Sequence, residues 1–145
     1  MDALQARLRA LAQALAAAHG AREAEAIARH WAAGVLGIAM HELALRRNYV
    51  LTAAEDAHWR AGEARLRAGE PLQYVLGYAD FLDMRLEVGP GVLIPRPETE
   101  ALALWGAAVL AQAPTSRFVD VCTGSGCIAL ALSQKVPAAY GLGLD

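Results

Sequence analysis

Leucines near the start of the chain recur at the spacing of an α-helix. Four of them stand three or four positions apart, with alanine and polar residues between them, so they share one helical face. These are Leu4, Leu8, Leu11 and Leu15. We expect this first helix to end near His19-Gly20, because glycine often closes a helix.

Two weaker helical segments follow. Residues 21–31 carry apolar side chains four positions apart, which predicts a second helix. Gly34 and Gly37 are expected to loosen the chain after it, because glycine disfavours a helix interior. A short helix is then predicted around Glu42–Arg46.

A capping box marks the start of a longer helix. Thr52 is followed three residues later by Glu55, and the two side chains can satisfy the first free N–H groups of a helix. This helix should stop at Gly69, with Pro71 just beyond it. The first half of the chain is therefore predicted to be entirely helical.

The hydrophobic period changes from helical to alternating after residue 80. Residues 81–88 alternate between apolar and polar side chains, which is typical of a half-buried strand. Gly89-Pro90-Gly91 is expected to turn the chain, and residues 92–94 to form a second short strand. We therefore predict a β-hairpin that links two domains.

A helix is predicted directly after this hairpin. Pro97 suits the first helical position, where its missing N–H costs nothing. Glu98 and Glu100 place negative charge in the first turn, which the helix dipole favours. The helix should run to about Ala113 and end at Pro114.

The last part of the chain alternates strands with a helix. Phe118–Val121 is predicted to be a strand, followed by a loop of small residues at 122–126 and a helix over 127–132. Tyr140–Leu144 is predicted to be another strand, and Asp145 follows it. This order is typical of an α/β domain in which a glycine loop and an acid hold a nucleoside cofactor.

Composition narrows the class of protein. Of the 145 residues, 56% are hydrophobic and 19% charged, as in a chain that forms a core. The net charge of −2 gives no basic field for nonspecific nucleic-acid binding. Two cysteines, Cys122 and Cys127, make no disulfide framework. We expect a cytoplasmic α/β protein with a helical domain (1–76), a hairpin linker (77–95) and the incomplete start of a second domain (96–145).

The glycine loop admits two interpretations. Gly124 and Gly126 also suit a plain strand-to-helix turn, but Asp120 before them and Asp145 after the next strand favour cofactor binding. N–H groups at a helix N-terminus can hold a carboxylate or a phosphate. S-adenosylmethionine presents the first and NAD the second, so this motif alone leaves both open.

Three longer motifs point to one family. Two prolines around Arg96 stiffen the middle motif, which also suits an ordinary helix start. The motifs are Gly69-Glu70-Pro71-Leu72-Gln73-Tyr74-Val75-Leu76-Gly77, Leu93-Ile94-Pro95-Arg96-Pro97-Glu98-Thr99-Glu100 and Asp120-Val121-Cys122-Thr123-Gly124-Ser125-Gly126-Cys127-Ile128-Ala129. With them, nearly the whole chain resembles the peptide chain release factor glutamine methyltransferases, the HemK/PrmC family.

This resemblance implies a Rossmann-like class I methyltransferase domain with S-adenosylmethionine as cofactor. The implied reaction is N5-methylation of the glutamine in a Gly-Gly-Gln motif of release factors, the proteins of translation termination. The implied cofactor-binding residues are Cys122, Thr123, Gly124, Ser125, Gly126 and Asp145. By the same analogy, Pro95, Arg96, Pro97, Glu98, Thr99 and Glu100 lie near the cofactor. Many members have glycine where this chain has Cys122. Cysteine is small enough to be accommodated there, but a positive φ would be less comfortable for it than for glycine.

The family's catalytic Asn-Pro-Pro-Tyr loop does not occur in these 145 residues. In the family its asparagine and a backbone carbonyl hold the substrate amide. We therefore expect no catalytic residue here and no methyl transfer by the 145 residues alone. We also expect the chain to fold poorly after Pro114, with proteases cutting first beyond that residue.

Rival functions stay open beside this one. A glutamine methyltransferase for a ribosomal protein would share the glycine loop but resembles Arg96–Glu100 less. A noncatalytic module that binds release factors would need no chemistry, and an NAD-dependent enzyme gives the Pro95–Glu100 segment no role. The scattered histidines lack metal-ligand spacing, so no metal is expected. We expect a monomer that binds release factors, with no membrane and no direct nucleic-acid contact.

Overall fold

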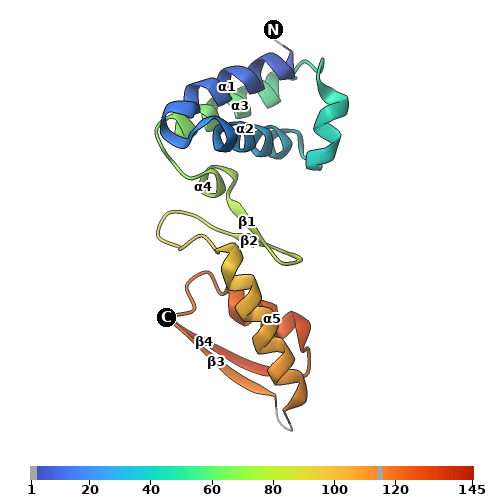
Figure 1. Ribbon diagram of the computed structural model, residues 1–145, viewed down its shortest axis with the longest axis vertical. Coiled ribbons are helices and arrows are strands. Elements are labelled where there is room, and N and C mark those ends of the chain that lie inside the picture. Colours follow the sequence, from blue (N-terminus) through green and yellow to red (C-terminus); the bar gives the residue numbers. More distant parts are fainter. Residues whose placement is uncertain (1–2, 114–115) are drawn as a thin grey trace. The chain divides into compact units, whose positions relative to one another are not determined.

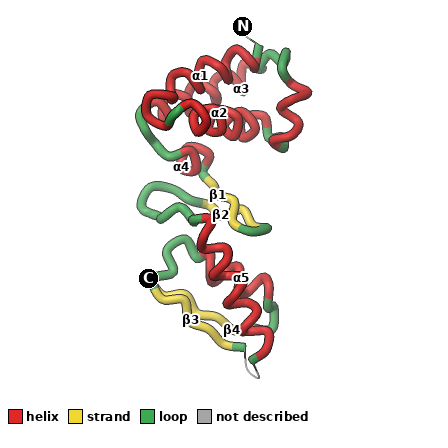
Figure 2. The backbone as a smooth tube through the Cα atoms, viewed as in Figure 1, coloured by secondary structure: helices red, strands yellow, loops and turns green. Residues whose placement is uncertain are grey.

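The computed structural model describes residues 3–113 and 116–145. It divides into two compact units at Leu76 and Gly77, which are called the helical unit and the second unit below. Figure 1 shows the course of the chain, and Figure 2 shows that the strands belong to the second unit. Pro114, where the sequence predicts a helix end and a protease-sensitive site, lies outside the described residues.

Helices build the described part of the helical unit. They are α1 (Leu4–His19), α2 (Ala21–Leu36), the 3-10 helix η1 (Met40–Arg46), α3 (Ala53–Arg67) and α4 (Leu72–Leu76). The leucine face expected of α1 is its buried face, because Leu4, Leu11 and Leu15 all lose their solvent contact. Removing such side chains from water is the main favourable term in folding.

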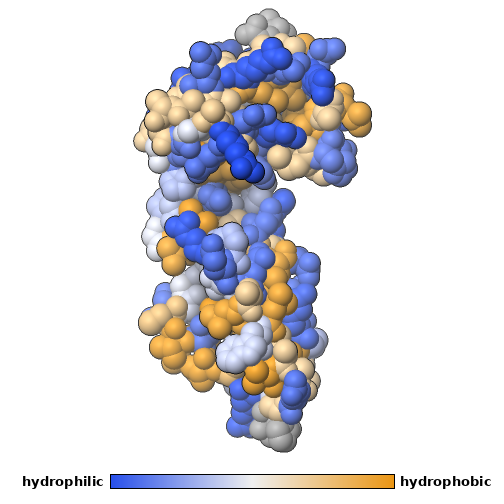
Figure 3. Space-filling model, in the orientation of Figure 1, coloured by the Kyte–Doolittle hydropathy of each residue, from blue (hydrophilic) through white to orange (hydrophobic). Residues whose placement is uncertain are grey.

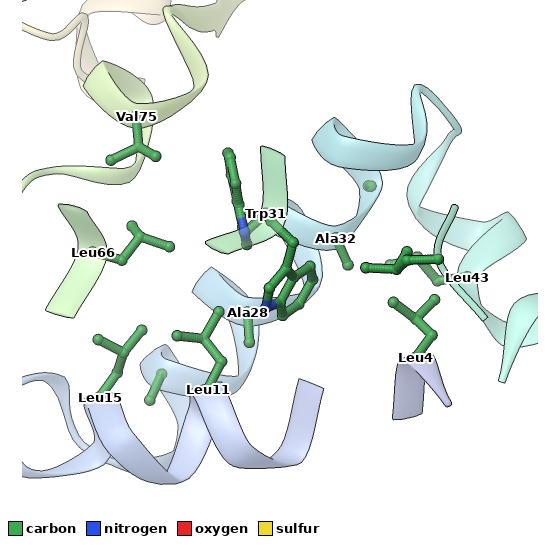
Figure 4. Packing of buried hydrophobic residues seen from close by; sticks show 13 residues of the cluster. Leu4, Leu11, Leu15, Ala28, Trp31, Ala32, Leu43, Leu66 and Val75 are labelled. Atoms are coloured by element: carbon green, nitrogen blue, oxygen red, sulfur yellow. The ribbon is translucent and has the colours of Figure 1, made fainter. Parts of the chain in front are cut away.

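Two tryptophans occupy the centre of the helical core. Trp31 of α2 is 1% exposed, and its ring centroid lies 6.5 Å from that of Trp59 on α3. Figure 4 shows side chains from α1, α2, η1, α3 and α4 converging around Trp31. Gly62 of α3 lets the Trp31 ring approach, since a Cβ at that position would lie 2.1 Å from the ring.

Helix boundaries follow capping chemistry. The predicted capping box is confirmed: Thr52 accepts from the Glu55 N–H, while the Glu55 carboxylate accepts from the Thr52 N–H. The break expected at Gly34 is wrong, because α2 continues to Leu36 and ends where Gly37 adopts a φ of 62°. A glycine costs a helix interior only about 1 kcal/mol, and burial of the preceding α2 residues outweighs that cost.

The hairpin exists, but the predicted register is wrong. Strands β1 (Tyr78–Phe81) and β2 (Met84–Glu87) pair antiparallel, with Phe81 opposite Met84. The chain therefore reverses at Leu82 and its neighbour, not at residues 89–91, and residues 92–94 form no strand. Leu82 makes the turn with a φ of 51°. This register buries the Phe81 ring, which the predicted strand would have left on its polar side.

An α/β arrangement completes the second unit. The elements are α5 (Pro97–Gln112), β3 (Arg117–Val121), α6 (Cys127–Lys135) and β4 (Tyr140–Leu144). The prediction of Pro97 as the first residue of a helix and that of two strands around the glycine loop are confirmed. Strands β3 and β4 pair in parallel, from Arg117 opposite Tyr140 to Val121 opposite Leu144.

The core of the second unit joins the hairpin to both helices. Phe81 of β1 packs with Ala103 of α5 and with Cys127 and Ala131 of α6. The sheet formed by β3 and β4 is less well covered, since Val119 and Val121 of β3 are 59% and 68% exposed. The helix that follows the glycine loop is thus fixed by apolar contacts, whereas the strands before and after it keep open apolar surface.

Candidate functional site

The loop between β3 and α6 has an unusual backbone. Cys122, Gly124 and Gly126 all have positive φ, at 61°, 54° and 73°. The loop is closed by a hydrogen bond from the Gly126 N–H to the Thr123 carbonyl at 2.9 Å. Its first turn is tied to β4, because the Thr123 N–H donates to the Leu144 carbonyl at 2.9 Å. Such conformations suit glycine, and Cys122 adopts one in spite of its side chain.

Asp120 organises the loop from the strand before it. Its Oδ2 accepts from the Thr123 hydroxyl at 2.8 Å and from the Ala129 N–H at 3.2 Å. The residue is half-buried. Through these two hydrogen bonds its carboxylate links the loop to the first turn of α6. From the sequence, Asp120 is noted as the acid before the glycine loop but is not predicted to be a site residue. Its bond with Ala129 depends on how α6 packs, which no local pattern shows.

Asp145 meets the glycine loop directly. Its Oδ1 accepts from the Gly124 N–H at 3.3 Å, so two residues 21 positions apart share one place in the fold. A Cβ added at Gly124 would meet nothing within 4 Å, which means that open space lies over the loop there. Gly124 is therefore needed for its φ of 54° and not for close packing within the chain.

Several N–H groups of this site point to no acceptor. Within residues 3–113 and 116–145, the backbone N–H groups of Ser125, Cys127 and Ile128 have no hydrogen-bond partner. The last two belong to the first turn of α6, where the helix dipole adds positive potential. Unpaired donors at such a place suit a carboxylate or a phosphate.

The two cysteines have separate environments. Cys127 is buried against Phe81 and Ala103, and Cys122 is exposed in the loop. In the part of the chain that the structure describes, no three His, Cys, Asp or Glu side chains gather as potential metal ligands.

The Pro95–Glu100 segment starts α5 and is held by the hairpin. Arg96 is the residue before the helix, and Pro97 is its first residue. The half-buried Glu100 carboxylate accepts from the Leu82 N–H at 2.9 Å. No hydrogen bond or ion pair between described residues joins this segment to the glycine loop.

A second contact holds the same hairpin turn from the end of α6. The Lys135 ammonium lies 2.7 Å from the Asp83 carboxylate. The hydrogen bond from Lys135 lowers the pKa of Asp83, and the positive charge of Lys135 adds to the effect. Helices α5 and α6 are thus both tied to this turn, α5 through Glu100 in its first turn and α6 through its last residue.

Comparison with known proteins identifies a family for the helical unit. Residues 7–77 match the family described as PrmC N-terminal domain. Relatives named release factor glutamine methyltransferase include one from Streptomyces coelicolor, 51% identical over 84 residues, which are 57% of this chain and 30% of the relative. Another, from Rhodospirillum rubrum, is 40% identical over 124 residues, which are 86% of this chain and 37% of the relative. The chain belongs to the release factor glutamine methyltransferase family.

The match is partial along the relatives. The chain spans about a third of the length of the curated relatives it matches. The family match covers the helical unit, and the longer alignment with the Rhodospirillum rubrum relative, over 86% of the chain, also takes in much of the second unit. Among the described residues, no helix has the length and apolar character needed to cross a membrane.

Proposed function

We propose that this chain supplies the N-terminal part of an enzyme that methylates release factors. The reaction would place a methyl group from S-adenosylmethionine on the side-chain N5 of the glutamine in a Gly-Gly-Gln motif. One observation carries the proposal: the strand–loop–helix in which Gly124 meets Asp145, in a chain of the release factor glutamine methyltransferase family. The parallel β3–α6–β4 unit supports a Rossmann-like class I methyltransferase domain.

The cofactor site of this proposal is built from two places in the chain. It comprises Cys122, Thr123, Gly124, Ser125, Gly126 and Asp145. The unpaired N–H groups of Ser125 and of the α6 start suit the carboxylate of the methionine moiety. The second oxygen of Asp145 has no partner among described residues and suits a ribose hydroxyl. When bound, S-adenosylmethionine supplies an electrophilic methyl group.

Positioning residues surround this site. Asp120 holds the loop through Thr123, and Glu100 holds the start of α5 through the hairpin. We place Pro95, Arg96, Pro97, Glu98, Thr99 and Glu100 near the cofactor in the complete domain. Two prolines keep that segment stiff, so little conformational entropy would be lost when it contacts a ligand.

No catalytic residue is proposed within the 145 residues. They contain no Asn-Pro-Pro-Tyr sequence, and Asn48 of the helical unit is their one asparagine. We therefore expect the 145 residues alone to transfer no methyl group. In the enzyme, the helical unit would dock the release factor, the second unit would hold the cofactor, and the protein would act as a cytoplasmic monomer.

A chimera tests the function. These 145 residues would replace the matching N-terminal part of the Streptomyces coelicolor relative, and methylation of a bacterial release factor would be followed by mass spectrometry of its Gly-Gly-Gln peptide. We expect methylation by the chimera and a loss of at least about tenfold with Asp145→Ala, since a ribose contact would be missing. Glu87→Ala removes an exposed carboxylate of β2 that has no part in the site and should leave the rate unchanged.

Two outcomes would overturn the proposal. A folded chimera that methylates a ribosomal protein and no release factor would assign the rival substrate. A folded chimera that binds the release factor but neither binds nor consumes S-adenosylmethionine would favour the noncatalytic binding module. Thermal melting of the chimera separates both from simple misfolding.

A further inference from the structure

A groove runs along the outside of the helical unit between α1, α2 and η1. Its floor is apolar and includes Leu8, Ala12 and Ala16 of α1. On α1 the lining residues stand three or four positions apart or next to one another, so they form one continuous stripe on the helix surface. They include Gln5, Leu8, Arg9, Ala12, Gln13 and Ala16. On the face shown in Figure 3, apolar surface in this region lies between strongly hydrophilic side chains. The groove has a volume of about 600 Å³.

The rim of the groove carries unpaired positive charge. Arg9 of α1, Arg29 of α2 and Arg47 after η1 line it, and Glu25 of α2 is the acidic residue among the lining side chains. Within the described residues, none of the three guanidinium groups makes an ion pair or a side-chain hydrogen bond. Four other arginines of the helical unit form ion pairs, among them Arg7 with Asp56 and Arg65 with Glu70, whereas Arg22 and Arg46 form none among the described residues. The rim is therefore locally positive in a chain whose net charge is −2.

We propose that this groove binds an amphipathic helix of a partner protein, with apolar residues on one face and acidic residues beside them. The stripe on α1 from Gln5 to Ala16 is about 17 Å long at the rise of an α-helix, which matches a partner helix of three turns. Small alanine side chains on the floor let a partner backbone come close. Acidic side chains of the partner would meet the three arginines, whose forked donors suit carboxylates.

This inference deepens the docking role given to the helical unit and rests on it in one respect, that the unit binds a protein. It does not involve the glycine loop or S-adenosylmethionine. Binding at the groove can therefore be tested on the 145-residue chain without the cofactor, and failure here is distinct from failure of the methyl-transfer proposal.

Fluorescence anisotropy with synthetic peptides provides the test. The first probe is a labelled helical peptide of about 12 residues with leucines on one face and glutamates on the flanks. The second has lysine in place of every glutamate. We expect the chain to bind the acidic peptide at least about tenfold more tightly than the basic one, with affinity falling as salt rises.

Matched variants locate the site. Arg29→Glu should weaken binding of the acidic peptide about tenfold or more, whereas Arg22→Glu should not. Arg22 lies on the same helix, is exposed and does not line the groove, so the charge change is the same. Ala44→Trp would block the groove from an exposed position, and Ala57→Trp on α3 is its control.

Several results would overturn the inference. Equal affinity for both peptides, no binding of either, or equal effects of Arg29→Glu and Arg22→Glu would each remove it. Tighter binding of a single-stranded RNA oligonucleotide, lost in Arg29→Glu, would assign the groove to nucleic acid. A dimer in analytical ultracentrifugation that Arg29→Glu dissociates would assign it to a second copy of the chain.

Discussion

Glu100 and Leu82 are joined by a hydrogen bond of 2.9 Å, from the Leu82 backbone N–H to the Glu100 carboxylate. Leu82 turns the hairpin with a φ of 51°, a conformation that costs a residue with a side chain about 1 kcal/mol or more. The bond satisfies a part-buried N–H group and holds the first turn of α5 against the hairpin. One carboxylate thus stabilises a strained turn and also positions the Pro95–Glu100 segment.

Replacing Glu100 should loosen that turn. We expect Glu100→Ala to destabilise the second unit by about 1–2 kcal/mol, because a part-buried donor loses a charged acceptor. The amide of Leu82 should exchange its hydrogen faster, as measured by NMR. Glu98→Ala in the same helical turn removes an exposed carboxylate and is the control. Unchanged protection of the Leu82 amide in Glu100→Ala would contradict the assignment.

Local signals predicted the helix boundaries better than the sheet. Thr52 with Glu55 marked a helix start, and Pro97 marked another, because capping depends on neighbouring residues. The hairpin turn was misplaced, since Leu82 carries no turn signal and Gly89-Pro90-Gly91 carries a strong one. The choice of register came from burying Phe81 against α5 and α6, which no local pattern records.

The candidate site was also predictable only in part, because local patterns indicate elements but not the contacts between distant ones. The order of β3, loop, α6 and β4 follows from local patterns, and so does the place of Asp145 after the second strand. The short α4 was not predicted. The contacts of Asp120 with Ala129, and of Glu100 with the hairpin, join elements distant in sequence, so the residues alone did not reveal them.

Two glycine-to-alanine changes in helices should have opposite effects. Alanine is favoured over glycine in a helix by about 1 kcal/mol. In α3, Gly62→Ala should nevertheless destabilise the helical unit by about 2 kcal/mol or more, because the new Cβ would lie 2.1 Å from the Trp31 ring. In α5, Gly106→Ala should be neutral or stabilising, since the new Cβ would meet only the Cδ2 atom of Leu132 at 3.1 Å, and that side-chain tip needs to shift by only a few tenths of an ångström.

Urea denaturation followed by circular dichroism checks both glycine changes. The Gly62→Ala midpoint should fall and the Gly106→Ala midpoint should not. Equal effects of the two changes would show that intrinsic helix preference, and not the Trp31 ring, decides the outcome.

Cys122 should be improved by glycine. Its φ of 61° strains a side chain, and glycine has no such cost. After allowing for the greater freedom of glycine in the unfolded chain, we expect Cys122→Gly to stabilise the second unit by about 0.5–1 kcal/mol. Cys122→Val should destabilise it by about 1 kcal/mol, because branching at Cβ worsens the strain. Cys122→Ala is the control for loss of the sulfur, and a destabilising Cys122→Gly would refute the strain argument.

Acid should weaken the helical unit through Glu55. The Thr52 N–H, together with the Thr52 hydroxyl, lowers the pKa of Glu55 below its ordinary value near 4.5. A lowered folded-state pKa means that the stabilisation is complete above the ordinary value and is lost as the pH falls through the lower one. The free energy of unfolding should therefore decline below about pH 4.5.

Glu55→Gln tests the origin of this decline. The variant should be less stable than the parent at pH 7 and should depend less on acid. Some dependence should remain, because the hydrogen bond from Arg65 also lowers the pKa of Glu70 in the same unit. A variant with the parent's full acid dependence would exclude Glu55 as a source. Urea titrations at a series of pH values supply the measurement.

Limited proteolysis should cut within the second unit before it cuts the helical unit. The helical unit closes its own core around Trp31 and Trp59, whereas Val119 and Val121 leave the β3 strand with exposed apolar surface. Cleavage should begin beyond residue 114, because open strand edges unfold locally at low cost. Mass spectrometry of early digestion products gives the result, and resistance through Asp145 would contradict it.

The three tryptophans divide between the units in unlike surroundings. Trp31 and Trp59 are each 1% exposed in the helical core, and Trp105 of α5 is 68% exposed. The buried indoles should emit at shorter wavelength and resist quenching by iodide, and the exposed one should do the reverse. A single emission spectrum of the unlabelled protein thus reports each unit separately. It would also register any protein segment that comes to cover the outer face of α5.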